Sequence, residues 1–398
     1  MRILYVNHTA QPSGAGISLS TLLRHLPADI EKFFLIPKAS EIDAMLGAAP
    51  ERTFRERFLC QFMTTRYVSR YPPHLLAWHL AKIPIALRRI SQLVRRWKID
   101  LVHANETSLL TYVFAASFSG VPSVLHARTA IAPRVFERWL ISRLSRTSNV
   151  RIAAIDSEVQ KSLPESIRHR SEIIYDPIEL GPAPSESEVA RLRESWHCEA
   201  DTVVVGQVAS IHRQKGIWLI LDLAEKLCSQ FPDVRFVLIG DTSASAGEGP
   251  LFREAIEERN LGSKVILPGY DARLSLVYGA IDIGLCMFGE HLGGVGRGAH
   301  EAAVAGKPLV ATLPDPGQTQ TVQHGVGGYA FAPEDQIGIE RALRTLIESP
   351  PLRKKLGEQG RASIGFRHQP ENIANRTLDL YSDLCPGSKC LARCTKEN

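Results

Sequence analysis

The sequence lacks several features that would define its class. No apolar run approaches the roughly 20 residues that a helix needs to cross a bilayer. The chain opens directly on a predicted strand, MRILYVN, so we expect no signal peptide. No RNA- or DNA-binding motif is present, which argues against a nucleic-acid partner. The seven cysteines are odd in number and mostly scattered, which favours free thiols in a reducing cytoplasm.

Patterns of metal ligands are missing as well. Cys385, Cys390 and Cys394 cluster near the end of the chain, but no histidine pattern of a zinc site joins them. No DxD motif lies in a suitable loop. We therefore predict that the protein holds no metal and needs no cofactor.

The composition that is present fits a globular protein with two domains. A chain of 398 residues exceeds the usual size of one hydrophobic core. The net charge of +5 hides an asymmetry, because residues 1–180 carry 24 Lys and Arg against 15 Asp and Glu, which leaves 23 against 27 for the rest. Most of the basic excess lies in residues 51–98, where 11 basic residues meet only Glu51 and Glu56.

The basic segment 51–98 also contains interleaved aromatic residues. A basic amphipathic surface can dock on anionic lipid head groups, with about 1 kcal/mol from each charge near the membrane. The alternative is a solvated helical face whose aromatic side chains pack inward. Both interpretations stay open on the sequence alone.

Strands and helices alternate along both halves of the chain. Predicted strands cover 3–6, 99–104, 121–128, 151–157 and 171–180 in the first half, and 202–209, 235–241, 265–269, 281–287 and 309–312 in the second. Unbroken apolar strands separated by helices are typical of parallel sheets covered on both faces. The expected fold class is α/β, with two facing Rossmann-like domains. Ligands are expected beyond the carboxyl ends of the strands, in one cleft.

The most informative segment runs from Ile281 to Pro308. It contains a buried strand, a glycine-rich loop between Gly289 and Gly298, and a short helix that carries Glu301. Glycines let backbone N–H groups converge on an anion, and the helix adds the positive end of its dipole. A carboxylate one turn into the helix is placed to accept hydrogen bonds from sugar hydroxyls. Phosphate and polyol together indicate a nucleotide sugar, whereas the alternative is a glycine-rich surface loop without a ligand.

The second half resembles the donor domain of family 4 (group 1) glycosyltransferases, which have the GT-B fold and are retaining enzymes that use nucleotide sugars. The resemblance rests on the strings VGQVASIHRQKG, FVLIGD, VILPGYDARLSLVYGAIDIGL and GVGRGAHEAAVAGKPLVAT. The first half is similar more loosely, through GAG at 14–16, DLVHAN and YDPIEL. Similarity covers nearly the full chain and is strongest for about 200–335.

The resemblance implies a set of site residues. Lys215 stands in the position of the phosphate-binding lysine, Glu301 among the family's paired glutamates, and His126 or Arg128 at the polar group presented to the transferred sugar. We expect these four residues to be catalytic. The other expected donor-binding residues are Gly14, Gly16, Ser210, Arg213, Glu290, Gly293, Gly294, Val295, Gly296 and Arg297.

The sequence departs from the family pattern at three positions. Ser210 stands where an arginine is usual, Gly293 stands where the family has its other glutamate, and Gln320 stands at the acidic position of the segment that closes the donor site. Arg213 and Glu290 lie nearby in the sequence and are candidates to replace the arginine and the glutamate.

The expected function is transfer of a sugar from a nucleotide-sugar donor to a polysaccharide or lipid-linked glycan precursor, as in lipopolysaccharide or capsule synthesis. We predict an acceptor domain at 1–180, a donor domain at 181–365, and a crossover helix and tail at 366–398. The expected location is cytoplasmic, and peripheral contact to an anionic membrane through residues 51–98 is one of the two interpretations left open for that segment. Two alternatives stay open: a nucleotide-sugar epimerase of the same fold, and a degenerate, non-catalytic partner protein.

Overall fold

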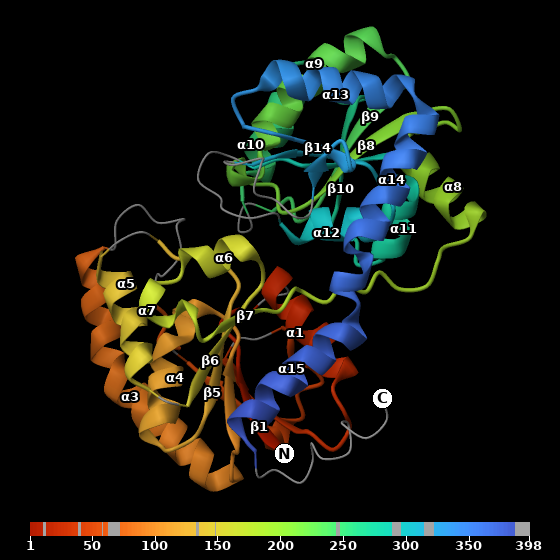
Figure 1. Cartoon of the computed structure of the whole chain (residues 1–398). Helices are drawn as coiled ribbons and strands as arrows, with labels where there is room; N and C mark the ends of the chain where they lie inside the picture. The colour runs from red at the N-terminus through yellow and green to blue at the C-terminus, as the bar shows by residue number, and fades with distance from the viewer. Residues whose placement is uncertain are drawn as a thin grey trace. The chain divides into compact units, whose positions relative to one another are not determined.

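The computed structural model describes residues 1–10, 13–38, 41–57, 59–62, 72–132, 135–147, 149–243, 247–288, 296–313 and 322–386. The chain divides into two compact units (Figure 1). Unit 1 holds residues 1–177 together with the chain from His368 onward, and unit 2 holds Ile178–Arg367. None of the helices in these described stretches is long and apolar enough to cross a membrane.

Unit 1 is built on seven parallel strands in the order β3-β2-β1-β4-β5-β6-β7. The strands are β1 (Arg2–Val6), β2 (Glu31–Pro37), β3 (Thr53–Glu56), β4 (Leu101–Ala104), β5 (Ser123–Ala127), β6 (Val150–Ala154) and β7 (Ser171–Ile173). The helices are α1 (Gly14–His25), α2 (Asp43–Leu46), α3 (Pro73–Trp97), α4 (Leu110–Phe118), α5 (Val135–Ser142), α6 (Ser157–Ser162), α7 (Glu165–Arg168) and α15 (Pro370–Leu384).

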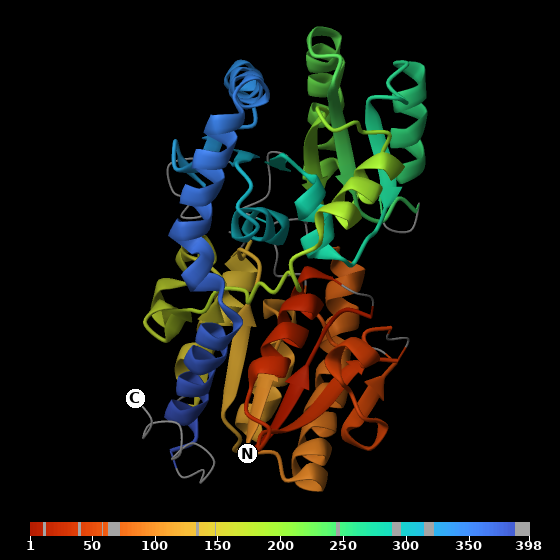
Figure 2. The same ribbon diagram turned by 90° about the vertical axis from the view of Figure 1, so that its right-hand side faces the viewer.

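Helices cover both faces of this sheet. Successive side chains of a strand point to opposite faces, so each strand contributes to two apolar clusters. Leu4 and Val6 of β1 join one apolar cluster with α3 and α4. Ile3 and Tyr5 join a second cluster with α1 and α15. Helix α15 packs against α1 on that second face, so the end of the chain completes the core of unit 1 (Figure 2).

Unit 2 repeats the design with strands in the order β10-β9-β8-β11-β12-β14-β13, also parallel. They are β8 (Val203–Val208), β9 (Val234–Ile239), β10 (Val265–Gly269), β11 (Ile283–Cys286), β12 (Leu309–Thr312), β13 (Gln323–His324) and β14 (Gly327–Phe331). The helices are α8 (Glu186–Ser195), α9 (Ile217–Gln230), α10 (Gly249–Glu258), α11 (Leu274–Ala280), α12 (Arg297–Val304), α13 (Gln336–Glu348) and α14 (Pro350–Ile364). Helices α9, α10 and α13 share one apolar cluster, and α8, α11 and α12 share the other.

The predicted α/β fold class is confirmed, whereas single elements differ from the prediction. The strand predicted over 171–180 is only β7, because the chain leaves the sheet after Ile174 and Pro177 has no N–H to donate. Strands β2, β3, β13 and β14 were not predicted. β3 is a short edge strand of mixed polarity, which gives little periodic signal.

Candidate functional site

In unit 2, the loop after β8 carries the cations predicted to meet phosphate. Ser210 and Arg213 are exposed, and Arg213 is already paired. Its Nε donates to Glu248 Oε1 at 2.7 Å and its backbone N donates to Glu248 Oε2 at 2.6 Å. The contact raises the pKa of Arg213 and lowers that of Glu248. The charge of Arg213, the candidate to replace the missing arginine, is therefore balanced by a neighbour.

Lys215 is a half-buried cation. Its Nζ lies 4.5 Å from the centroid of the Phe288 ring, and burial lowers the pKa of the ammonium group. No carboxylate of the described residues forms an ion pair with it. A desolvated ammonium group with no carboxylate beside it is the arrangement that an anionic ligand stabilises.

Gln207 fixes the backbone around Lys215. This side chain is buried in β8, and its Nε2 donates to the Lys215 carbonyl oxygen at 2.8 Å. Its Oε1 accepts from the Met287 N–H, also at 2.8 Å. One amide therefore joins the loop after β8 to the chain that leaves β11. Gln207 was not predicted as a site residue from the sequence, although a polar residue inside an otherwise apolar strand can indicate a functional or structural contact.

Two glycines allow close approach of the backbone at this edge of the sheet. Gly216 has φ +63°, and a Cβ atom there would lie 2.6 Å from Met287 Cβ. A Cβ atom at Gly296 would lie 2.6 Å from Phe288 Cζ. Neither position accepts a side chain without a shift of its neighbours.

Glu301 lies in the second turn of α12 and is buried. Arg297 Nε donates to Glu301 Oε1 at 2.7 Å. The hydroxyl of Tyr278 lies 3.1 Å from Glu301 Oε2 and 3.0 Å from the Gly298 carbonyl oxygen. Burial, and then the charge of Glu301, raises the pKa of Tyr278 well above its ordinary value, so the hydroxyl keeps its proton. Gly296 precedes α12 as its N-cap, whereas Glu290, Gly293, Gly294 and Val295 lie outside the described residues.

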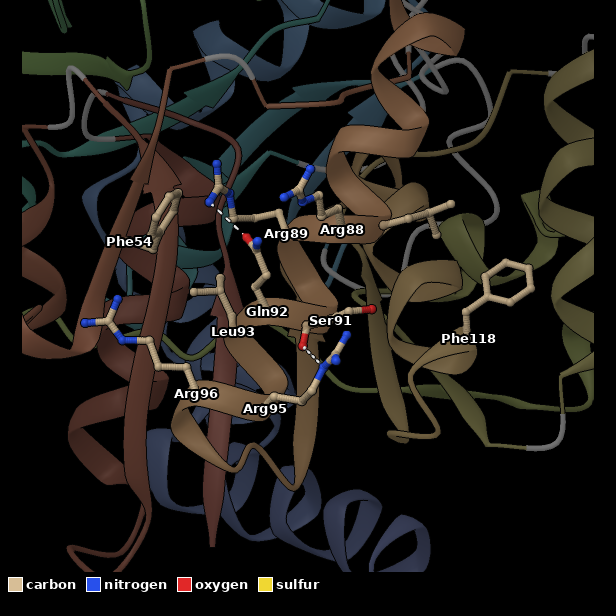
Figure 3. Close-up of a pocket in the computed structure, with 10 residues that line it drawn as sticks. Phe54, Arg88, Arg89, Ser91, Gln92, Leu93, Arg95, Arg96 and Phe118 are labelled. Atoms are coloured by element: carbon tan, nitrogen blue, oxygen red, sulfur yellow. Dashed lines mark hydrogen bonds between the residues drawn. The ribbon is translucent and has the colours of Figure 1, made fainter.

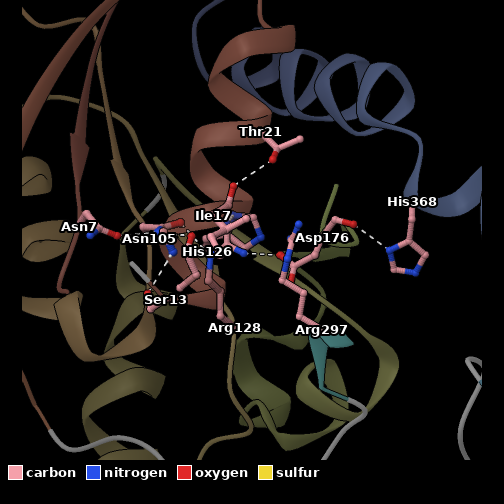
Figure 4. Close-up of polar contacts among 12 residues, drawn as sticks. Asn7, Ser13, Ile17, Thr21, Asn105, His126, Arg128, Asp176, Arg297 and His368 are labelled. Atoms are coloured by element: carbon pink, nitrogen blue, oxygen red, sulfur yellow. Dashed lines mark hydrogen bonds and ion pairs between the residues drawn. The ribbon is translucent and has the colours of Figure 1, made fainter. Parts of the chain in front are cut away.

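In unit 1, polar side chains follow the carboxyl ends of neighbouring strands and contact one another (Figure 4). Asn7 follows β1, Asn105 follows β4, Arg128 follows β5 and Asp176 lies beyond β7. Asn105 Nδ2 donates to Asn7 Oδ1 at 2.8 Å, and Arg128 Nε donates to Asn105 Oδ1 at 2.8 Å. Arg128 also forms an ion pair with Asp176. This is the edge at which parallel α/β sheets bind ligands.

The start of α1 joins this polar group. Ser13 caps the helix, and its Oγ accepts from the Gly16 N–H at 3.3 Å. Asn105 Nδ2 also donates to the Ala15 carbonyl oxygen at 3.1 Å. Gly14 is exposed and Gly16 is buried. The asparagines were not among the predicted site residues, although a polar residue directly after a buried parallel strand would have indicated them.

The two candidates of the VLHAR string lie in different surroundings. His126 belongs to β5 and only 1% of it is exposed, whereas Arg128 follows the strand. His103 Nε2 and Arg128 Nη2 lie 3.3 and 3.4 Å from His126 Nδ1. Burial, and then the charge of Arg128, lowers the pKa of His126 well below its ordinary value. His126 is therefore a neutral group inside the sheet, whereas Arg128, also buried and paired with Asp176, lies just beyond the end of β5.

The directions of these hydrogen bonds follow from Arg128, which can only donate. His126 Nδ1 must accept, so His103 Nε2 donates to it. The neutral ring of His103 then accepts through Nδ1 from the Tyr381 hydroxyl, which lies 2.6 Å away. A buried chain of contacts thus links α15 to Arg128.

Comparison with known proteins identifies the family. The model for glycosyl transferases group 1 matches residues 189–363, and the model for glycosyltransferase family 4 matches residues 12–181. The chain belongs to the group 1 glycosyltransferases. The predicted family is thereby confirmed.

Characterised relatives of this glycosyltransferase are distant. Glycogen synthase of Mycobacterium tuberculosis is 25% identical over 331 residues, which cover 77% of this chain and 75% of the relative. The D-inositol 3-phosphate glycosyltransferase of Corynebacterium urealyticum is 26% identical over 298 residues, 72% of this chain and 67% of the relative. The crystal structure of Anabaena HepE with UDP matches with a TM-score of 0.77 and 19% identity, over 96% of this chain and 100% of that one. That likeness confirms the GT-B fold.

Proposed function

We propose that this glycosyltransferase transfers a sugar from a nucleoside-diphosphate sugar, held by unit 2, to a hydroxyl of a glycan or lipid-linked acceptor. The C1–O bond to the diphosphate breaks, and the diphosphate leaves with the bonding electrons. The acceptor oxygen bonds to C1 and loses its proton. We propose retention of configuration at C1 from the family resemblance, and NMR of the product's anomeric proton would test it.

The environment of Lys215 is the observation that carries this proposal. A desolvated ammonium group without a counter-ion favours a ligand with concentrated negative charge. Such a group stabilises a leaving diphosphate most strongly where water is excluded. The Anabaena relative was crystallised with UDP and with UDP-glucose, which supports a nucleoside diphosphate as the anion here.

The other residues have proposed roles that follow from their positions. Glu301 has lone pairs left after Arg297 and Tyr278 are satisfied, so it can accept from ribose hydroxyls. Arg128 is suited to the sugar or the acceptor, because its guanidinium group lies where the strands end. His126 acts through Arg128, since its own ring is enclosed. Arg213 would bind phosphate only if it left Glu248.

We propose that transfer needs no metal, because cations and backbone amides of the chain can neutralise the leaving group. Turnover unchanged by EDTA, and not increased by added magnesium, would support this. Magnesium-dependent turnover would reject it.

We also propose that residues 51–98 dock on an anionic membrane where lipid-linked acceptors lie, at its cytoplasmic side. Helix α3 carries several arginines, and it exposes Trp78 and Ile85 by 51% and 56%. Cationic and apolar side chains on one helix suit the interface between head groups and hydrocarbon.

The variant Lys215→Ala tests the donor site. Calorimetry should show an affinity for UDP and for UDP-glucose at least about thirtyfold lower, because loss of one partner of a desolvated charge pair costs 2 kcal/mol or more. Lys355→Ala is the matched control, since Lys355 is exposed on α14. Unchanged UDP affinity in Lys215→Ala would place the diphosphate elsewhere.

A further inference from the structure

Two neighbouring hollows lie on the α3–α4 side of unit 1. The larger, about 800 Å³, is lined by Arg88, Arg89, Arg95 and Arg96 of α3, with Phe54 opposite (Figure 3). The smaller, about 140 Å³, is lined almost entirely by apolar side chains of α3, α4 and α5, among them Ile83, Phe114 and Leu140. Leu87 and Phe118 line both, so the two hollows adjoin.

The larger hollow carries an excess of positive charge. Arg89 Nε pairs with Glu56 Oε2 at 3.0 Å. In the described part of the chain no carboxylate pairs with Arg88, Arg95 or Arg96. Figure 3 shows Arg88 and Arg89 at one level of α3 and Arg95 and Arg96 about two turns further along it. The positive charges that line this hollow repel one another, and a bound anion would reduce that repulsion. Guanidinium groups also match the geometry of phosphate oxygens.

The smaller hollow has the opposite character. A cavity of about 150 Å³ lined by Leu, Ile and Phe stays dry and admits a molecule the size of benzene. The hollow here is of that size and kind, so it suits a short stretch of hydrocarbon. Phe118, at the junction of the hollows, is 80% exposed. Its ring lines both hollows, so it presents an apolar surface between the arginines and the apolar hollow.

We propose that the two hollows together bind one anionic lipid, with its phosphate among the arginines and the first part of a hydrocarbon chain in the apolar hollow. This proposal rests on the proposed membrane docking of residues 51–98 and names the lipid that would be bound there. It does not depend on the donor site in unit 2. Charge alone would suit free phosphate or nucleic acid equally well. The adjoining apolar hollow is what selects a lipid.

The place of the hollows in unit 1 indicates that this lipid anchors the enzyme and is not the acceptor. Helix α3 ends at Trp97, just before β4 begins, and α4 ends at Phe118, just before β5 begins. The arginine-lined hollow therefore lies toward the amino ends of the strands, and the smaller hollow extends from Phe118 along α4 to Leu110 at the start of that helix. Asn7, Asn105 and Arg128 follow the carboxyl ends, at the opposite edge of the same sheet.

The experiment measures binding of soluble ligands to the full chain by calorimetry. Dioctanoyl phosphatidate, kept below its micelle concentration, should bind at least tenfold more tightly than inorganic phosphate and than uncharged dioctanoylglycerol. The double variant Arg95→Gln/Arg96→Gln and the single variant Phe118→Gln should each lose at least tenfold of that affinity. All of these side chains are exposed, so folding is not at risk.

Matched controls are Arg376→Gln on α15, and Phe366→Gln, whose ring is also exposed. Both should bind the lipid normally. UDP affinity should stay unchanged in all four variants, which separates failure of this site from failure of the proposed donor site. Phosphate binding as tightly as the lipid would overturn the proposal in favour of a simple anion site. Single-stranded DNA competing as well as the lipid would overturn it in favour of nucleic acid.

Discussion

At the scale of single residues, Glu301 shows how one carboxylate can serve both the fold and a ligand. Its two oxygens accept from Arg297 and Tyr278, both of which are largely buried. A carboxylate offers about four lone-pair sites, so hydroxyl groups of a nucleotide can still donate to it. Hydrogen bonds to a charged acceptor contribute about 1.5–3 kcal/mol.

Glu301→Gln should therefore lower UDP affinity about tenfold, because the amide keeps the shape and one acceptor but loses the charge. Glu301→Ala should lose more, and should also lower the melting temperature because Arg297 loses its partner. Calorimetry and thermal unfolding measure the two effects. Tyr278→Phe is the control that keeps the carboxylate, and it should bind UDP within a few fold of the parent. Normal UDP binding by Glu301→Ala would rule out its role as a ribose ligand.

At the scale of elements, α15 belongs to unit 1 although it follows the whole of unit 2 in the sequence. It places Ile373, Ala374, Leu380 and Tyr381 in the core with β1 and α1. Tyr381 also contacts His103, which contacts His126 and, through it, Arg128. Helix α15 therefore contributes to the stability of unit 1. Through these contacts it also helps to hold Arg128 beyond the carboxyl end of β5.

Leu380→Ala should lower the free energy of unfolding of unit 1 by about 2–5 kcal/mol, the usual cost of such a cavity in a core. Asp379→Ala, at the exposed neighbouring position, should change it by less than about 0.5 kcal/mol. Urea unfolding measures both. UDP affinity should survive in Leu380→Ala, because the proposed UDP ligands belong to unit 2. An equal effect of the two variants would show that α15 is not an integral part of the core.

At the scale of the whole molecule, the two units differ in their buried titratable groups. In unit 1, burial lowers the pKa of His103 to about 3 and that of His8 to about 4, and lowers that of His126 well below 6.5. Burial raises the pKa of Asp156 to about 6 and also raises that of Glu106. In unit 2, burial lowers the pKa of Lys215 and Lys307.

Unit 1 should therefore lose stability as the pH falls below about 6.5. There the unfolded chain binds protons at the three histidines that the folded unit does not bind, at up to about 1.4 kcal/mol per pH unit for each. The raised carboxyl groups act in the opposite direction, since the folded unit binds their protons more tightly, and they reduce the loss below about pH 6. Hydrogen exchange in urea, followed peptide by peptide, separates unit 1 from unit 2. His103→Asn should reduce the pH slope of unit 1 by about one proton, and an unchanged slope would mean that His103 is not the buried base described.

The sequence could predict the features that depend on local pattern. Apolar strands alternating with helices predicted two parallel sheets, and the glycine-rich strings with Lys215 and Glu301 indicated the family. Periodicity and turn chemistry are properties of neighbouring residues, so they can be recognised in the sequence without knowledge of tertiary contacts. Strands β2, β3, β13 and β14 were missed. Of these, β3 and β13 are short edge strands and give little periodic signal.

The tertiary structure decided which charges are balanced and which are not. Arg213 and Lys215 lie two residues apart and looked equivalent, yet Glu248, 35 residues after Arg213, neutralises only the first. His126 and Arg128 also looked equivalent, until the sheet enclosed one and left the other at its edge. Burial and pairing depend on residues distant in the chain, such as Tyr381 beside His103. Only the folded chain brings these groups together and sets the charge that each presents to a ligand.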